Sequence, residues 1–158
     1  MTTLVLIASK HGATQDIADR MRQTWEAAGE HVLVEHAENP GDSLTQATRV
    51  VVGVPVYKQK LLATGVTFLE NHAAQLQDKE LFIFASGGSP QLDQKLRDQL
   101  QTHTPHEVAY FRGAVDSAKL NLAEKAILKV VKSPLDADWR DWEEISRWAR
   151  ELPTDRTA

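Results

Sequence analysis

Short apolar runs alternate along the chain with longer segments in which apolar residues recur every three or four positions. The short runs predict strands over residues 3–8, 31–36, 49–54, 80–85 and 107–112. The periodic segments predict helices over residues 13–28, 62–76, 91–101, 117–131 and 138–151. This alternation is typical of an α/β fold, in which a parallel sheet is covered by helices on both faces.

Two of the predicted strands indicate their places in such a sheet. Residues 49–54 are apolar on both faces, which favours a central strand that ends at Pro55. Residues 31–36 carry Val32 and Val34 among the polar residues His31, Glu35 and His36, which favours an edge strand. We therefore expect a doubly wound, five-stranded parallel sheet with its predicted strands in the order 2-1-3-4-5. With 158 residues, 42% of them hydrophobic, residues 1–158 are expected to form one domain.

Three predicted strand-to-helix loops meet at one edge of this sheet: residues 9–14, 55–60 and 86–90. The first loop joins a buried strand to the start of a helix, where unpaired peptide N–H groups and the positive end of the helix dipole attract an anion. Ser9 and Thr14 add hydroxyl donors there. We expect this loop to hold the phosphate of a mononucleotide.

Composition narrows the function classes. The net charge of −4 argues against a nucleic-acid partner, and the absence of cysteine excludes disulfides and thiol catalysis. The histidines show no metal-ligand spacing, and the glycine-rich motifs of dinucleotide and triphosphate sites are missing. We expect a cytoplasmic protein with no secretory signal and no transmembrane span. Lysines along residues 117–131 leave open whether that helix covers the sheet or contacts a membrane surface peripherally.

The first loop resembles the phosphate loop of flavodoxins, with His11 at the place of the middle threonine. Within that superfamily the chain is most similar to the menaquinone-dependent protoporphyrinogen IX dehydrogenase branch. The stretches that carry this likeness are Val51-Val52-Gly53, Phe111-Arg112-Gly113-Ala114, Asp141-Trp142-Glu143 and Ala149-Arg150-Glu151. The resemblance implies a flavodoxin-like fold and FMN as the cofactor.

The resemblance also implies two groups of FMN ligands. The residues implied at the phosphate are Ser9, Lys10, His11, Gly12, Ala13 and Thr14. The residues implied at the isoalloxazine ring are Pro55, Val56, Tyr57, Ser86, Gly87 and Gly88. An aromatic side chain stacks well on a flat ring, so Tyr57 is the expected stacking residue. Flavin chemistry needs no protein acid or base at the ring, and we name no catalytic residue.

Three functions follow from these features. The first is a flavodoxin-like oxidoreductase that passes electrons to a redox partner protein or to a small acceptor such as a quinone. The second is protoporphyrinogen IX dehydrogenase activity, but residues 86–90 stand where that branch carries a long basic insertion, which favours the first. The third is a module that has lost FMN and serves as a binding partner.

Overall fold

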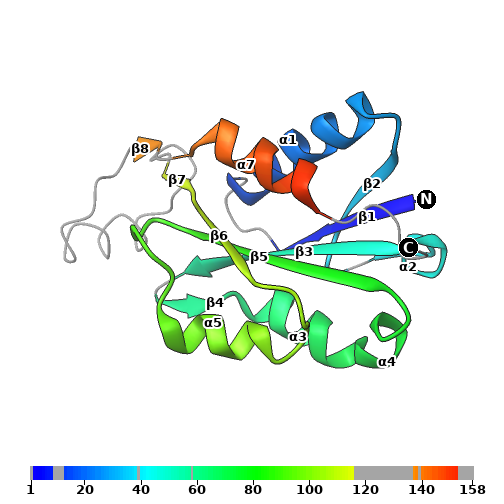
Figure 1. The fold of residues 1–158 in the computed structure, drawn as a ribbon. Coiled ribbons are helices and arrows are strands. Elements are labelled where there is room, and N and C mark those ends of the chain that lie inside the picture. Colours follow the sequence, from blue (N-terminus) through cyan, green and yellow to red (C-terminus); the bar gives the residue numbers. More distant parts are fainter. Residues whose placement is uncertain are drawn as a thin grey trace.

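The computed structural model describes residues 2–8, 13–38, 40–57, 59–115, 137–138 and 140–152. Neighbouring strands of its main sheet path are all parallel (Figure 1). In spatial order they are β2 (His31–His36), β1 (Thr2–Ile7), β3 (Arg49–Tyr57), β5 (Glu80–Gly87) and β6 (Ala109–Arg112). These are the five predicted strands in the predicted order. The doubly wound α/β architecture is confirmed.

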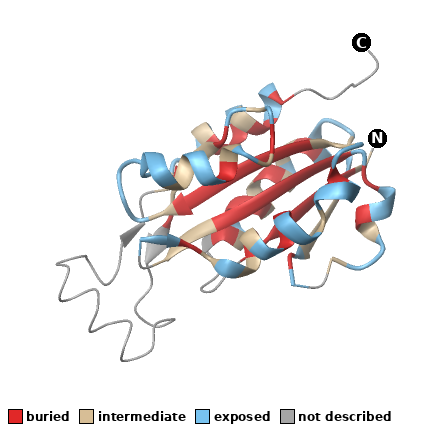
Figure 2. Cartoon of the chain, turned by 90° about the horizontal axis from the view of Figure 1, so that it is seen from below, coloured by how far each residue is buried: buried red, intermediate tan, exposed pale blue. Residues whose placement is uncertain are grey.

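Helices cover both faces of the sheet, as Figure 1 shows. On one face lie α1 (Ala13–Ala27) and α7 (Trp142–Glu151); on the other lie α3 (Ala63–Asn71), α4 (Ala73–Leu76) and α5 (Gln94–Gln101). Side chains alternate along each strand, so every strand contributes to both layers. In β1, Val5 and Ile7 pack toward α1 and α7, whereas Leu4 and Leu6 belong to the opposite layer. The buried strands between exposed helix surfaces are visible in Figure 2.

Several predicted helices differ from the observed ones. The helix predicted over residues 62–76 is divided at His72 into α3 and α4. The last helix begins at Trp142, where Asp141 caps it by accepting a hydrogen bond from the Glu144 N–H at 3.0 Å. The helix predicted over residues 91–101 begins at Gln94, after the cap residue Asp93. At the last two helices a side-chain cap, from Asp93 or Asp141, sets a start that is later than the apolar periodicity predicts.

Short elements complete the chain. They are α2 (Ser43–Gln46), β4 (Lys60–Leu61), β7 (Ala114–Val115) and β8 (Ala137–Asp138). β7, which directly follows β6, pairs antiparallel with β8, so residues 114–115 and 137–138 lie side by side. The helix predicted over residues 117–131 lies outside the described residues. The β7–β8 pair is not among the strands predicted from the sequence and is a finding of the structure.

Gly53 is required by the packing of a neighbouring strand. A Cβ atom at this position would lie 2.8 Å and 2.9 Å from two ring atoms of Phe84, and closer still to the Cζ atom. Phe84 is fully buried, and its ring also contacts Phe111 and Trp148, with centroids 5.8 Å and 6.2 Å away. The ring of Phe84 therefore packs directly against the backbone of β3 at Gly53, so close that a side chain at this position would overlap it.

Replacing Gly53 by alanine is expected to destabilise the fold by about 2 to 3 kcal/mol, because the buried ring must leave its position. Urea unfolding followed by circular dichroism measures the change. The double variant Gly53→Ala/Phe84→Leu, in which the ring is absent, should recover part of the loss. An unchanged unfolding midpoint in Gly53→Ala would show that the core accommodates the added methyl group.

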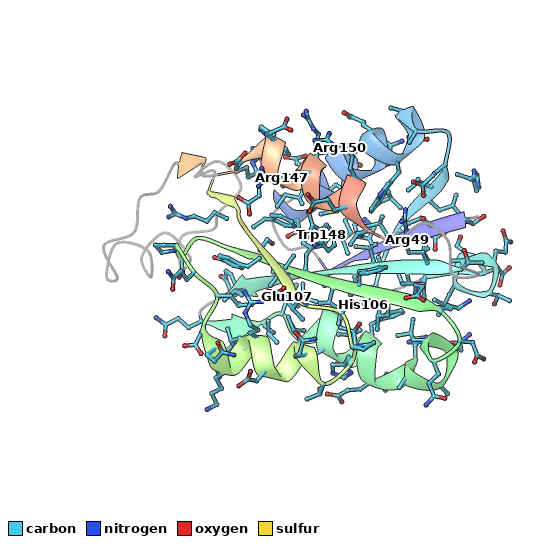
Figure 3. All side chains as sticks on the ribbon, viewed as in Figure 1. Arg49, His106, Glu107, Arg147, Trp148 and Arg150 are labelled. Carbon is cyan, nitrogen blue, oxygen red and sulfur yellow. The ribbon has the colours of Figure 1, made fainter. Side chains whose placement is uncertain are left out.

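At the amino end of the sheet, Arg49 is the centre of a buried polar cluster (Figure 3). Its side chain is 1% exposed; Nη2 donates to Glu30 at 2.6 Å and Nε donates to the Thr3 hydroxyl at 3.0 Å. The guanidinium carbon lies 4.8 Å from the centroid of the Trp25 ring. Burial lowers the pKa of Arg49, and the carboxylate of Glu30 opposes that shift. The cluster joins β1, β3 and the end of the α1–β2 connection.

Candidate functional site

The carboxyl ends of β1, β3 and β5 meet at one edge of the sheet. Ile7 pairs with Gly53, and Pro55 pairs with Ser86, so β3 and β5 extend beyond the end of β1. The N–H of Ala8 still donates to the carbonyl of Gly53 at 3.0 Å. The strand order reverses between β1 and β3, and ligands of doubly wound sheets bind outside such a reversal. The observed topology thus brings to this edge the ends of the three strands that the predicted loops follow.

The start of α1 is the part of the predicted phosphate site that the structure describes. Ser9, Lys10, His11 and Gly12 lie outside the described residues, and Ala13 opens the helix. Thr14, in the first turn, is 2% exposed, and its hydroxyl forms a hydrogen bond of 2.9 Å with the hydroxyl of Ser86. This contact joins the first predicted loop to the third. The sequence predicts that both residues belong to one site, and the structure brings them together.

The second predicted loop is a β-hairpin. Pro55 was expected to end the third strand, but β3 continues to Tyr57, so this prediction is wrong. Val56 pairs with Leu61 and Tyr57 with Lys60, in antiparallel register, and Gln59 turns the chain with a φ of 61°. Proline has no N–H to donate, and it is tolerated here because β1 ends opposite Gly53, so no strand on that side needs this donor; the carbonyl of Pro55 accepts from Leu62 at 2.9 Å. Cross-strand pairing therefore fixes the half-buried Tyr57 at the edge.

The third predicted loop is held by β6 through its carbonyl groups. The carbonyl of Gly87 accepts from the N–H of Gly113 at 2.8 Å, and that of Gly88 accepts from Arg112 at 2.8 Å. The carbonyl of Ser89 accepts from the hydroxyl of Tyr110 at 2.6 Å. With three successive carbonyls engaged on one side, the peptide N–H groups of this loop are the groups that can donate to a ligand. Sequence reasoning assigned no role to Tyr110 or Arg112.

The Tyr110 phenol is expected to ionise above the usual tyrosine range. Burial raises its pKa, while the charge of Arg112 opposes that shift. Because the folded pKa exceeds the unfolded value of about 10, the bond to Ser89 contributes fully below pH 10 and is lost as the pH rises through the folded value. Phenolate absorbance of the folded protein, compared with Tyr110→Phe, isolates this titration. A difference spectrum that titrates at or below the ordinary range would contradict the expectation.

A cation lies near the start of α1. Arg140, just before α7, is 13% exposed, and its Nη1 donates to the Asp16 carboxylate at 2.9 Å. Its guanidinium carbon lies 4.7 Å from the centroid of the Trp142 ring. Asp16 in the first turn of α1 would weaken anion binding there, and Arg140 compensates this negative charge. Arg140 and Asp16 are 124 positions apart, and no local sequence signal indicates their contact.

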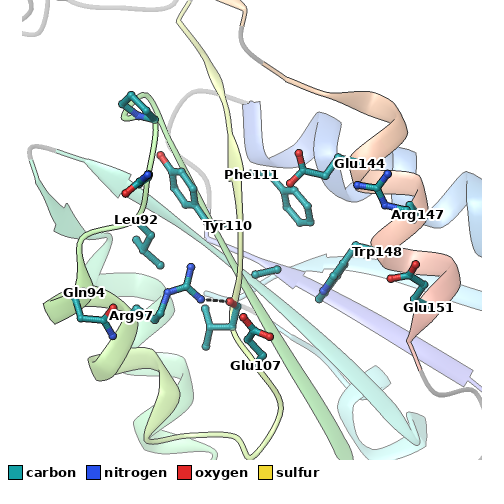
Figure 4. Close-up of a pocket in the computed structure, with 14 residues that line it drawn as sticks. Leu92, Gln94, Arg97, Glu107, Tyr110, Phe111, Glu144, Arg147, Trp148 and Glu151 are labelled. Atoms are coloured by element: carbon teal, nitrogen blue, oxygen red, sulfur yellow. Dashed lines mark hydrogen bonds between the residues drawn. The ribbon is translucent and has the colours of Figure 1, made fainter.

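A separate cavity of about 570 Å³ lies along the outer edge of β6, between α5 and α7 (Figure 4). Leu92, Phe111 and Trp148 supply apolar surface, and the charged side chains around them are of both signs. Of the described residues that line this cavity, only Pro90 comes from the three predicted loops. The cavity therefore borders the candidate site at one residue and is not part of the strand reversal.

Comparison with known proteins identifies the family. A family model described as Flavodoxin domain matches residues 4–139. The chain belongs to the flavodoxin-domain family. This confirms the flavodoxin-like resemblance and supports, in general terms, an FMN-binding electron carrier. The finer likeness to the protoporphyrinogen dehydrogenase branch stays a prediction.

Solved flavodoxins share the fold of this family member. Oxidised flavodoxin 2 from Bacillus cereus has a TM-score of 0.63 and 16% identity, covering 95% of this chain and 96% of its own. The flavodoxin of Streptococcus pneumoniae TIGR4 has a TM-score of 0.64 and 20% identity, covering 96% and 97%. An FMN-bound mutant flavodoxin from Fusobacterium nucleatum has a TM-score of 0.51 and 12% identity, covering 73% and 70%. No curated protein matches the chain.

Two further observations apply to the described part of this flavodoxin-domain chain. None of its helices combines the length and apolar composition that a bilayer crossing requires. Its described histidine, aspartate and glutamate side chains form no group of three or more that could hold a metal ion.

Proposed function

We propose that the chain binds FMN at the carboxyl edge of its sheet and carries electrons between redox partners. The observation that carries this proposal is the buried Thr14–Ser86 hydroxyl pair at the first turn of α1, where two of the three site loops meet. The family and the fold support the same cofactor. When bound, FMN supplies electron transfer at its isoalloxazine ring, and the chain supplies binding, orientation and electrostatics.

The phosphate end of the site is proposed from the loop and helix that follow β1. Peptide N–H groups from Lys10 to Thr14, the side chains of Ser9 and Thr14, and the dipole of the 15-residue α1 would bind the dianion. Lys10 and His11 are proposed as additional donors on the same loop. The donor set fits a phosphate ester because its described members are uncharged donors at a helix start, with Asp16 compensated by Arg140.

The ring end is proposed from the β3–β4 hairpin and the loop after β5. Tyr57, with Pro55 and Val56, would line one side of the isoalloxazine ring. The N–H groups around Gly87 and Gly88 would donate to the carbonyl oxygens at its polar edge, since the loop carbonyls are already engaged by β6. Because β3–β4 pairing and the bonds to β6 hold these groups, the ring end of the site would be formed before the ligand arrives.

The proposed partners are a redox protein or a quinone-type small molecule, in the cytoplasm. The connection between β5 and α5 supports a carrier or small reductase over porphyrinogen oxidation, because it spans only residues 88–93. The porphyrinogen activity is tested separately, by offering protoporphyrinogen to the oxidised flavoprotein and a quinone to the reduced one. Rapid formation of porphyrin would replace the carrier proposal by the dehydrogenase.

Titration of the purified chain with FMN tests the central proposal. Binding is expected to quench flavin fluorescence and to shift the visible absorbance of the ring as it leaves water. Absence of any bound flavin at millimolar FMN would refute the proposal and favour the flavin-free binding module. Near-ultraviolet circular dichroism of the same sample shows whether the chain is folded during the test.

A further inference from the structure

The side chains of Thr14 and Ser86 contribute two hydroxyl protons, but the single hydrogen bond between them uses only one. Both are more than nine-tenths buried, at 2% and 3% exposed, and their oxygens lie 2.9 Å apart. Each hydroxyl has one proton, and within a pair only one hydroxyl donates to the other. In the described part of the chain neither hydroxyl has a further hydrogen bond. One buried O–H is therefore left to donate to an acceptor outside the described residues.

The places of the two residues indicate which hydroxyl supplies that proton. Thr14 belongs to the first turn of α1, next to the proposed phosphate loop. Ser86 lies on β5, opposite Pro55 and in line with Phe84, two residues earlier on the same face. Thr14 is thus the member adjacent to the phosphate loop, and Ser86 lies behind it on the sheet.

We propose that Ser86 is a positioning residue for the phosphate of FMN, acting through Thr14. This inference rests on the proposed function. A phosphate dianion only accepts hydrogen bonds, so Thr14 must donate to it and must accept from Ser86. The direction of the chain of donors, from Ser86 to Thr14 to the phosphate, is fixed by the charge of the ligand. Ser86 was expected at the polar edge of the ring; its contact assigns it to the phosphate end.

The consequence is selectivity between two flavins that share the same ring. Riboflavin lacks the phosphate, so the Thr14 hydroxyl has no anionic acceptor in its complex, and its orientation does not affect binding. Removal of the Ser86 hydroxyl should therefore weaken FMN binding without weakening riboflavin binding. A role of Ser86 in ring binding, or in the general packing of the site, would weaken both flavins alike.

The test measures dissociation constants of FMN and riboflavin for the whole chain and for Ser86→Ala. We expect FMN affinity to fall about tenfold, the effect of one buried hydrogen bond to a charged system, and riboflavin affinity to change less than twofold. Thr45→Ala removes an exposed hydroxyl from α2, outside the three site loops, and should leave both constants unchanged. Equal losses for the two flavins in Ser86→Ala would overturn the inference.

A double-variant cycle with Thr14→Val tests whether the effect passes through Thr14. Valine keeps the shape of threonine and removes its hydroxyl. In the Thr14→Val background, Ser86→Ala should have no further effect on FMN affinity. A further tenfold loss there would mean that Ser86 acts on its own and would also overturn the inference. A wild-type chain that binds neither flavin would refute the proposed function itself, which is a different outcome.

Discussion

Replacing Gly12 by aspartate is expected to abolish FMN binding, with an affinity at least ~100-fold lower than that of the wild type. Gly12 lies in the loop that resembles the flavodoxin phosphate loop, directly before α1. A carboxylate there would face the phosphate dianion at close range, and its Cβ would keep the backbone away from the ligand. Fluorescence titration with FMN measures the loss, and riboflavin titration shows how much of it depends on the phosphate.

The matched control for this variant adds the same charge on α1, the helix that follows the loop. Gln23 is exposed in α1 and distant from its first turn, so Gln23→Glu should bind FMN within about twofold of the wild type. Circular dichroism of both variants checks that they fold. Wild-type affinity in Gly12→Asp would show that the loop after β1 does not hold the phosphate, and the proposed orientation of the cofactor would be wrong.

Replacing Glu30 by alanine is expected to lower the free energy of unfolding by about 3 to 4 kcal/mol. Glu30 is 15% exposed and is the carboxylate partner of Arg49, whose side chain is 1% exposed, at 2.6 Å. The variant would remove the carboxylate that pairs with a buried guanidinium, and the uncharged hydroxyl of Thr3 does not replace it. Urea unfolding at neutral pH measures the change. FMN affinity of the folded variant should stay unchanged, because the cluster lies at the opposite end of the sheet.

Two further variants test whether the large stability loss expected for Glu30→Ala is caused by the burial of the ion pair. Glu26→Ala breaks an exposed pair with Arg22, in which the charged atoms lie 3.6 Å apart, and should cost less than about 0.5 kcal/mol. Glu30→Ala/Arg49→Met removes both charges of the buried pair, so it should be more stable than Glu30→Ala. If Glu30→Ala proved as mild as Glu26→Ala, water would have to reach Arg49 and solvate it.

The sequence pattern was sufficient for the five strands, because β1, β3 and β5 contain short apolar runs and the two outer strands keep apolar residues among polar ones, and the doubly wound pattern predicted their order. It failed at Pro55, where a residue that commonly ends strands is accommodated by an edge hairpin with Lys60 and Leu61. It also placed the start of the last helix too early. The cap at Asp141 depends on one side-chain bond, whereas the apolar spacing continues through the preceding residues.

The residues of the candidate site with a local sequence signal could be proposed before the structure was known. Thr14 and Ser86 belong to loops with recognisable local chemistry, so their common site could be inferred before their contact was known. The residues that hold these loops in place could not be predicted from the sequence. Tyr110 and Arg112 act on the β5 loop from a different strand, and Arg140 reaches Asp16 from the far end of the chain. Such contacts arise from tertiary proximity, which spacing along the sequence does not encode.

The Arg49 cluster also has a geometric role that reaches the other end of the sheet. Arg49 is the register partner of Thr3 and bonds to its side chain, which fixes β3 against β1 lengthwise. A slip of two residues, the smallest that keeps each side chain on its face, would displace one strand by about 7 Å. Strands have a nearly constant rise per residue, so the register held at Thr3 and Arg49, together with the backbone ladder, also aligns the carboxyl ends of β1 and β3. The Arg49–Thr3 bond thus supports the strand alignment at the edge where FMN binding is proposed.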